Sequence, residues 1–331
     1  MSKRRFLMAF CMGLLAFSTQ VHAQKVGFLL DSYIMDRWYL DHKFFEEKVK
    51  SMGGECRVEV PNGDAVLQVS MAKKMIDEGV EVLVVVPIDA DMAGEIVSYA
   101  KKKNVPVISY DRLIKSQDIA AYIGYNSEMV GRMEAEYLVK KVPEGNYVLI
   151  NGPTSDNNAI LQRKGQKEVL APYIQSGKIK LVGDLILRDW SEIETLMRFD
   201  EFISTTDERI DAIIAGNDVV ANGCIQALPK DQVGKIAVAG QDADISAIKN
   251  IIAGSQTVTI YKPIKPLAEL AAQTAMELKK GNSSSDFTEF TTDGYTVKAL
   301  LLNPIQVYKE NINDTVLKDG HVTSSQLSKK N

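Results

Sequence analysis

The segment VISYDRLI (Val107–Ile114) begins like a buried β-strand and then places two opposite charges side by side. Val107, Ile108 and Tyr110 favour a strand, whereas Asp111 and Arg112 are ionised at neutral pH. A chain does not leave such charges unpaired in a dry core, because removing an ion from water costs several kcal/mol. The segment therefore predicts a strand that ends at a polar site, and the other strand ends test the idea.

Short β-branched runs alternate with longer amphipathic stretches along most of the chain. The runs are KVGFLL (25–30), EVLVVVP (81–87), VPVISY (105–110), NYVLING (146–152), KIKLVGD (178–184), DAIIAG (211–216), KIAVAG (235–240) and QTVTIY (256–261). The helical stretches between them are 37–52, 67–78, 92–104, 128–141, 160–175, 192–205, 219–228 and 264–280. This alternation predicts an α/β protein with doubly wound parallel sheets covered by helices on both faces.

Polar residues follow nearly every one of these predicted strands. They are Asp31-Ser32, Asp111-Arg112, Asp156-Asn157-Asn158, Trp190, Asn217-Asp218, Gln241-Asp242 and Lys262. Asp, Asn and Ser are also preferred helix N-caps, so any single instance has an ordinary explanation. Arg112, Lys262 and Trp190, however, are not residues that cap helix N-termini. Ligands of open α/β sheets bind just beyond the carboxyl ends of the strands, and we expect a cleft there.

The first residues have the pattern of a secretory signal peptide. Lys3, Arg4 and Arg5 precede an apolar run, 6–17, and Val21-His22-Ala23 provides a small-residue cleavage site before Gln24. The run is shorter than the roughly 20 apolar residues that span a bilayer. Residues 1–23 are therefore expected to direct export to the periplasm, with a lipid anchor on Cys11 as the less favoured alternative because Phe10 precedes it.

The remaining composition narrows the function further. The net charge is −4 and no basic stripe is present, which argues against nucleic acid as a partner. Cys56 and Cys224 fall in a strand and a helix, so we expect two buried thiols rather than a disulfide. His42 and His321 have no neighbours at metal-ligand spacing, and no metal or other cofactor is expected.

The residue types at the strand ends suit a sugar. Vicinal hydroxyls both donate and accept, and carboxylate, amide and guanidinium groups match adjacent hydroxyls in pairs. The indoles of Trp38 and Trp190 could stack on the apolar face of a sugar ring, although core packing is an alternative for both. No G-x-G-x-x-G follows the first strand, which disfavours a dinucleotide. An amino-acid ligand would use similar groups, so composition alone leaves that alternative open.

Several longer phrases resemble a known family, the bacterial periplasmic D-xylose-binding proteins, which capture sugar for ABC importers. The phrases are DRWYLD (36–41), VEVLVVVP (80–87), ISYDRLI (108–114), GNYVLINGPTSDNNAILQRKGQ (145–166), PYIQSGKIKLVGD (172–184), IDAIIAGND (210–218), GQDADISAIKNI (240–251) and GSQTVTIYKPI (254–264). The combination of YDR, DNNA and YKPI is far more specific than GND or GQD alone. The resemblance covers nearly the whole mature chain and implies two doubly wound α/β lobes joined by a three-stranded hinge, the type I periplasmic-binding fold.

The resemblance also implies a set of ligand-binding residues. These fall on Arg37, Asp111, Arg112, Asn158, Arg163, Trp190, Asn217, Asp242 and Lys262. The chain departs from the family pattern in the first loop, DSYIM (31–35), and in NSSSDFTEFTTDGY (282–295), which we interpret as a variable surface loop. The first departure makes D-xylose a less secure expectation than a pentose in general.

The expected mechanism is hinge closure around the sugar. The N-terminal lobe should hold 24–126 and 264–304, and the C-terminal lobe 127–263 and 305–331, with crossings near Asn126, Pro263 and Pro304. Each lobe would carry half of the site, so that neither satisfies the ligand alone. We expect a monomer that delivers a monosaccharide to the membrane permease of an ABC importer.

Three other functions share features with this sequence. An enzyme acting on sugars, such as a dehydrogenase or a glycosidase using Asp111 and Asp242, is disfavoured because the dinucleotide motif is missing and cationic or amide neighbours would keep both carboxylates ionised. A sugar-responsive repressor would need a DNA-binding segment where the export signal lies. A periplasmic sensor that presents the sugar to a membrane kinase or chemoreceptor stays open, since the sequence does not separate it from a transporter.

Overall fold

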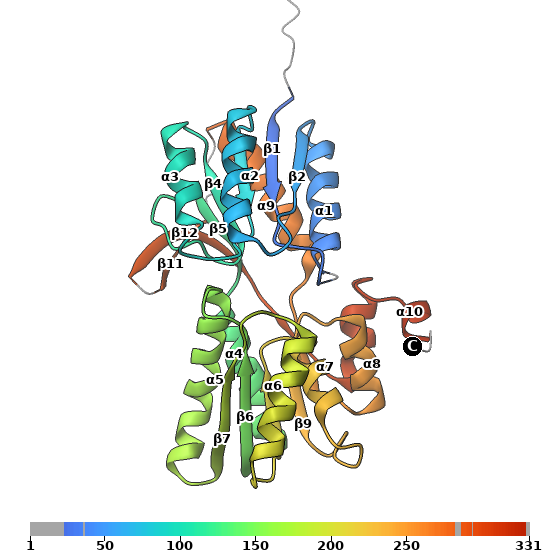
Figure 1. Ribbon diagram of the computed structural model, residues 1–331. Helices are drawn as coiled ribbons and strands as arrows, with labels where there is room; N and C mark the ends of the chain where they lie inside the picture. Colours follow the sequence, from blue (N-terminus) through green and yellow to red (C-terminus); the bar gives the residue numbers. More distant parts are fainter. Residues whose placement is uncertain (1–22, 36, 282–285, 293, 329–331) are drawn as a thin grey trace, which may run out of the picture.

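In the computed structural model, residues 23–35, 37–281, 286–292 and 294–328 are described, and they form two α/β lobes stacked end to end (Figure 1). The expected signal peptide lies almost entirely outside the described residues. None of the helices in the described part of the chain combines the length and the hydropathy that a membrane span requires.

The N-terminal lobe is built on a sheet with the strand order β11-β12-β5-β4-β3-β1-β2, parallel except where β11 meets β12. Its strands are β1 (Lys25–Leu29), β2 (Glu55–Glu59), β3 (Val82–Val85), β4 (Val107–Asp111), β5 (Ala121–Tyr125), β11 (Thr288–Thr292) and β12 (Tyr295–Leu302). Its helices are α1 (Arg37–Ser51), α2 (Ala65–Asp77), α3 (Gly94–Lys102) and α9 (Ile264–Lys279).

The C-terminal lobe repeats this plan with the strand order β13-β10-β9-β8-β6-β7, in which β13 is antiparallel to β10. Its strands are β6 (Gly145–Asn151), β7 (Ile179–Ile186), β8 (Ala212–Ala215), β9 (Ala237–Gln241), β10 (Val258–Tyr261) and β13 (Ile305–Val307). Its helices are α4 (Ser127–Lys141), α5 (Asn157–Gln175), α6 (Glu192–Thr205), α7 (Asp218–Ala227), α8 (Ile245–Ala253) and α10 (Ser324–Ser328).

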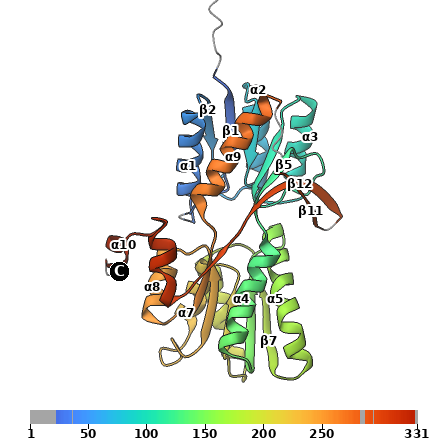
Figure 2. The same cartoon turned by 180° about the vertical axis from the view of Figure 1, so that it is seen from behind.

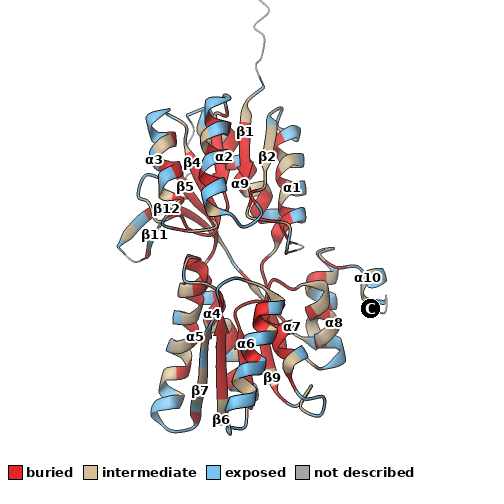
Figure 3. Cartoon of the chain, viewed as in Figure 1, coloured by how far each residue is buried: buried red, intermediate tan, exposed pale blue. Residues whose placement is uncertain are grey.

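The central strands of both sheets are buried on both faces, which is why they read as continuous apolar runs. In the N-terminal lobe, α1 and α9 pack on one face and α2 and α3 on the other. In the C-terminal lobe, α4 and α5 cover one face and α6 and α7 the other. Figure 3 shows the result, with buried strands inside and exposed helix faces outside. The predicted fold class is confirmed.

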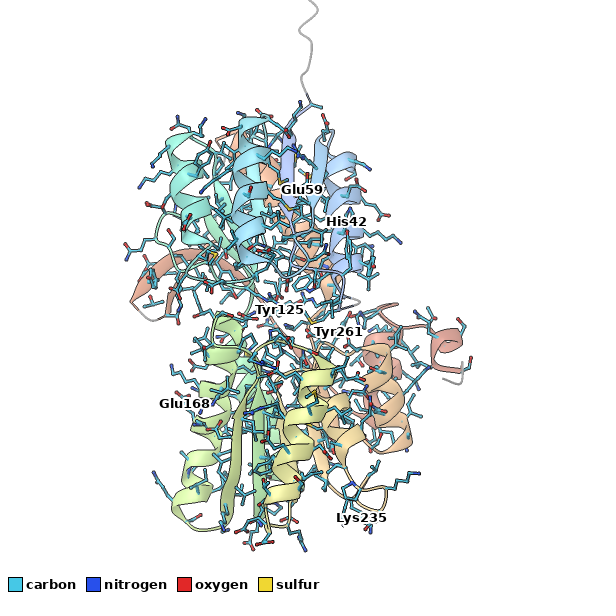
Figure 4. All side chains as sticks on the ribbon, in the orientation of Figure 1. His42, Glu59, Tyr125, Glu168, Lys235 and Tyr261 are labelled. Carbon is cyan, nitrogen blue, oxygen red and sulfur yellow. The ribbon has the colours of Figure 1, made fainter. Side chains whose placement is uncertain are left out.

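The chain passes from one lobe to the other after β5, after β10 and after β12 (Figure 2). Tyr125 ends β5 and its hydroxyl donates to the carbonyl of Pro263, 2.8 Å away, so two of these crossings are tied together. Figure 4 labels Tyr125 and Tyr261 at this junction. Beyond the last crossing, the C-terminal tail (residues 305–328) packs against α8 of the C-terminal lobe.

Two predictions from the sequence are wrong in part: the loop at 282–295 and the burial of Cys56. The segment 282–295 is not simply a surface loop, because its described part forms β11, which pairs antiparallel with β12. Thr288 and Glu289 are exposed on this edge strand, and that polarity hid it from the apolar pattern. Cys56 lies on β2 and Cys224 in α7, both as free thiols as expected, but Cys56 is half-buried rather than buried.

Helices α4 and α5 approach each other closely through paired glycines. A Cβ atom on Gly131 would overlap the carbonyl oxygen of Gln162, and one on Gly165 would overlap that of Glu128. Only glycine allows the two backbones to come this near. The contact matters for the site below, because α5 begins at the cleft with Asp156 as its N-cap.

Replacing Gly131 with alanine should lower the free energy of unfolding by about 1–3 kcal/mol, because the added methyl group must push α4 and α5 apart. Urea unfolding of the sugar-free protein would measure the loss. Gly94→Ala is the matched control, since the nearest atom to its added methyl would be 3.9 Å away and alanine favours a helix. Equal stability of the two variants would contradict the packing argument.

Candidate functional site

The cleft between the lobes is lined by two aspartates in strained backbone conformations. Asp111 ends β4 with a φ of 59°, and Asp242 follows β9 with a φ of 93°. Non-glycine residues rarely adopt such angles, and strain of this kind gathers at functional sites. Each lobe thus turns one carboxylate out of its strand and into the cleft.

Arg37, the first residue of α1, joins these carboxylates. Its Nη2 donates to Asp111 Oδ1 at 2.9 Å and its Nη1 to Asp242 Oδ1 at 3.1 Å, which bridges the lobes. Its Nε donates to Asp41 Oδ2 at 3.3 Å, one helical turn further along α1. All of these groups are buried, so each charge depends on the others for compensation.

The charge balance keeps Asp111 ionised. Burial by itself raises the pKa of this carboxyl, but Arg37, Lys262 and Arg112 together lower it to about 2. Lys262, on the crossing after β10, also places its Nζ 3.1 Å from Asp242 Oδ1. Both cleft carboxylates therefore have cationic partners and can act as acceptors.

Arg112 makes a second bridge between the lobes. Its Nη1 donates to Asp31 Oδ2 at 2.9 Å, within its own lobe, and its Nε lies 2.9 Å from Asp156 Oδ2 in the other lobe. Asp156 Oδ2 also accepts from the indole nitrogen of Trp190 at 3.0 Å. This carboxylate accordingly fixes both a guanidinium and an aromatic ring at the cleft.

Trp190 fits its place because two glycines lie beneath the ring. A Cβ atom on Gly152 would overlap the indole, and one on Gly216 would come within 2.9 Å of its Cζ3. Trp38 is different: it is 1% exposed, and the guanidinium carbons of Arg37 and Arg112 lie 4.4 and 5.5 Å from its ring. Trp190 is thus the indole that is available for stacking.

Helix caps and site residues coincide in the C-terminal lobe. Asn217 Oδ1 accepts from the backbone of Val220 at 2.8 Å, and its Nδ2 approaches Met35 Sδ of the other lobe at 3.8 Å. Asn158 Nδ2 donates across the cleft to the carbonyl of Asp111 at 3.0 Å, while its buried Oδ1 has no partner. Capping a helix and facing the cleft are therefore not competing explanations for Asn217.

These groups enclose a small cavity between the lobes, with a volume of about 20 Å³. Its lining comprises Met35, Arg37, Trp38, Asp111, Arg112, Asp156, Asn158, Trp190, Asn217, Gln241, Asp242 and Lys262. Such a volume admits a water molecule and little more. Among the described residues, no cluster of three or more His, Cys, Asp or Glu side chains is arranged to hold a metal ion.

Comparison with known proteins agrees with this architecture. Residues 26–283 match the family model described as a periplasmic binding protein domain. The chain is 42% identical to the D-xylose-binding periplasmic protein of Haemophilus influenzae, over 95% of this chain and 96% of that protein. It is 41% identical to the protein of the same name from Escherichia coli, over 99% and 100%.

This chain belongs to the periplasmic binding protein family.

A solved member of similar fold is an ABC transporter solute binding protein from Clostridium phytofermentans with bound β-D-glucose. It matches with a TM-score of 0.84 and 27% identity, covering 92% of this chain and all of that one. The family match and this structural similarity confirm the type I periplasmic-binding fold that the sequence predicted for the chain.

The structure brings together all but one of the expected site residues. Arg163 does not line the cavity; its guanidinium pairs with Asp184 of β7, with Nε 2.8 Å from Oδ1. It lies five residues beyond Asn158 on α5, which turns it by about 140° around the helix. We therefore leave Arg163 out of the proposed site.

Four residues of the lining were not among the expected binders: Met35, Trp38, Asp156 and Gln241. Asp156 and Gln241 stood at strand ends and carried the same signal as their neighbours. Met35 lies in the DSYIM loop, and its sequence context did not show whether its side chain would lie in the cleft or in the core.

A buried polar network supports the cleft from behind. Glu134 of α4 accepts from Gln162 Nε2 at 2.6 Å and from Gln166 Nε2 at 2.8 Å. The same Gln162 Nε2 and the cavity residue Gln241 both donate to the carbonyl of Gly216. Burial raises the pKa of Glu134 to about 8, although the two glutamines oppose this.

The Glu134→Gln variant should therefore have a flatter pH dependence of stability. A carboxyl whose pKa rises on folding from 4.5 to about 8 stabilises the fold fully below pH 4.5 and loses that contribution as the pH rises through 8. In the unmodified protein we expect a loss of about 1 kcal/mol or more between pH 5 and pH 8. Urea unfolding at each pH would measure it, and identical profiles for both proteins would contradict the assignment.

Proposed function

We propose that the protein is a periplasmic binding protein that captures a monosaccharide, D-xylose, between its lobes and delivers it to an ABC importer. The observation that carries the proposal is the set of groups that meet across the cleft: Arg37 with Asp242, and Arg112 with Asp156. The two D-xylose-binding relatives support the choice of sugar, since each aligns over nearly its full length.

The chemistry of the cleft suits a small polyol. The carboxylates of Asp111 and Asp242 offer acceptors, whereas Arg37, Arg112 and Lys262 offer donors, so neighbouring hydroxyls can donate to one group and accept from another. Charge-assisted bonds of this kind are about twice as strong as neutral ones. The ring of Trp190 would cover the C–H face of the sugar, and the unpartnered Oδ1 of Asn158 would accept a further hydroxyl.

The mechanism follows from the small size of the cavity. Since about 20 Å³ does not admit a sugar ring, the lobes must part before a ligand binds. The crossings near Asn126, Pro263 and Pro304 would absorb the motion, with lobes of 24–126 plus 264–304 and 127–263 plus 305–331. A sugar that bonds both lobes favours, by its differential affinity, an arrangement in which they close on it and leave more room than the present cavity.

The binding energy needed is modest. A micromolar dissociation constant corresponds to about −8 kcal/mol. Neutral hydrogen bonds contribute about 1 kcal/mol each and those to charged groups more, so six to eight bonds with a stacked ring suffice. No covalent step is required, and we propose that the protein is not an enzyme.

We further propose that residues 1–23 are a signal peptide that exports the chain to the periplasm, where it acts as a monomer. The membrane partner would be the permease of the importer. Such a partner would read the arrangement that the two lobes adopt around a bound sugar.

A thermal-shift screen of the mature protein against monosaccharides tests the proposal directly. A ligand at 1,000 times its Kd stabilises the folded state by about 4 kcal/mol. D-xylose should therefore raise the melting temperature most, because we expect it to have the lowest Kd of the sugars tested. D-glucose, with its additional hydroxymethyl group, should raise it less in a pocket that closes around a pentose. Equal shifts for both sugars would refute pentose selectivity, and no shift with any sugar would refute the function.

The Arg112→Ala variant should bind D-xylose about 100-fold more weakly or worse, since it removes a donor and leaves Asp31 and Asp156 without their cation. Isothermal titration calorimetry would measure the change. Arg163→Ala is the matched control: it removes the same side chain outside the cavity, and Asp184 keeps Lys167 at 2.6 Å. Its affinity should stay within about twofold of the unmodified protein. Equal losses in both variants would remove Arg112 from the site.

A further inference from the structure

The cleft carboxylate of Asp242 depends on a backbone turn that is unfavourable by itself. Asp242 and the next residue, Ala243, both have positive φ angles, 93° and 56°. Two successive non-glycine residues in this region persist only where the surroundings hold them, because each costs about 1–3 kcal/mol. The groups that hold the turn are therefore part of what directs Asp242 at Arg37 and Lys262.

Three backbone N–H groups of the turn are held from within the C-terminal lobe. Asp242 N donates to the carbonyl of Ile260 at 2.8 Å, which continues the pairing of β9 with β10. Ala243 N donates to Thr259 Oγ1 at 3.2 Å, and Asp244 N donates to Asp218 Oδ2 at 3.0 Å. Thr259 Oγ1 itself donates to Asp218 Oδ2 at 2.8 Å, so these supports form one buried network.

The carbonyl of Ala243 is held by a residue from the C-terminal tail. His321 Nε2 lies 3.0 Å from this oxygen, 78 positions away in the sequence. A carbonyl can only accept, so Nε2 must carry the hydrogen. Burial lowers the pKa of His321, which favours the neutral ring.

The tail also encloses the turn by packing. The imidazole of His321 lies against the ring of Tyr261, with centroids 4.7 Å apart. The methyl group of Ala243 is fully buried in one apolar cluster with Val316 and Val322 of the tail. The antiparallel pairing of β13 with β10 brings the tail to this position after the last crossing.

The N-terminal lobe has a similar arrangement at Asp111, where a side chain also donates to a carbonyl of the strained turn. The carbonyl of Asp111 accepts from the hydroxyl of Tyr122 at 3.0 Å, and Tyr122 belongs to the neighbouring strand β5 of the same sheet. In both lobes a side chain that does not line the cavity bonds a carbonyl of the strained turn. His321 provides in the C-terminal lobe what Tyr122 provides in the N-terminal lobe.

We propose that His321 is a positioning residue of the binding site: through its hydrogen bond to the Ala243 carbonyl, the C-terminal tail fixes the direction of the Asp242 carboxylate. The inference rests on the proposed function only for the identity of the ligand. Loss of the bond leaves a buried carbonyl unpaired and lets the turn relax, which moves Asp242 away from Arg37 and Lys262.

The first experiment compares three variants of the full mature chain by calorimetric titration with D-xylose. His321→Ala should raise the Kd about tenfold. His321→Gln should restore it to within about threefold, because the glutamine amide can carry an N–H to nearly the same place. Thr323→Ala is the control in the tail, since the hydroxyl that it removes bonds to Ser325 and Gln326 beside it, and the Kd should not change.

A role in stability alone would give a different pattern. It would lower the melting temperature of His321→Ala but leave the Kd unchanged well below that temperature, and this result would overturn the proposal. Equal increases in Kd for the His321→Ala and Thr323→Ala variants would overturn it as well, and so would a glutamine variant as weak as the alanine variant.

A second measurement needs no sugar. Hydrogen–deuterium exchange of the sugar-free protein should be faster at the amides of residues 242–244 in His321→Ala, and near the original rate in His321→Gln. Unchanged exchange in the alanine variant would show that His321 does not hold the turn. If the unmodified protein bound no monosaccharide, the proposed function would fail, and the exchange rates would still decide the role of His321.

Discussion

The guanidinium of Arg37 lies between carboxylates from both lobes, and this contact organises the cleft. Asp41 and Asp111 reach it from the N-terminal lobe and Asp242 from the C-terminal lobe. A buried cation needs all the compensation that it can find, because desolvation is expensive and a missing partner is costly. In the proposed opening of the lobes, Arg37 loses Asp242 and must be satisfied by water. The proposed closure is therefore coupled to charge pairing through one side chain at the start of α1.

The position of the carboxylates is in turn a property of the backbone. Asp111 and Asp242 leave their strands through left-handed residues, and neither conformation is stable on its own. Tyr122 and His321 bond the carbonyls of these turns without lining the cavity. The geometry of the cleft thus depends on residues behind it. The network around Glu134 supports Gln241 in the same way, because Gln162 and Gln241 both donate to the carbonyl of Gly216.

The fold also uses single residues for two purposes. Asn217 and Asp156 cap α7 and α5 with one oxygen each and leave their other polar atom for the cleft. This economy arises because parallel strands end where the following helices begin, so caps and ligand-binding groups occupy the same edge of the sheet. Gly152 and Gly216 complete the arrangement, since any larger residue would displace Trp190.

The sequence by itself determined the α/β plan and the edge of the sheets on which the site lies, and its resemblance to a known family implied the two lobes. The α/β plan and the edge follow from local patterns: apolar runs for strands buried on both faces, and charged or amide residues directly after them. Arg163 was misplaced because a family motif does not state which way a helical side chain points, and β11 was missed because an edge strand carries no apolar run. Only the tertiary structure decided that Arg37 joins both lobes and that His321 supports Asp242. These contacts, Arg37 with Asp242 and His321 with Ala243, link residues that are 205 and 78 positions apart. No periodicity in a sequence records which distant groups a folded chain brings within hydrogen-bonding distance.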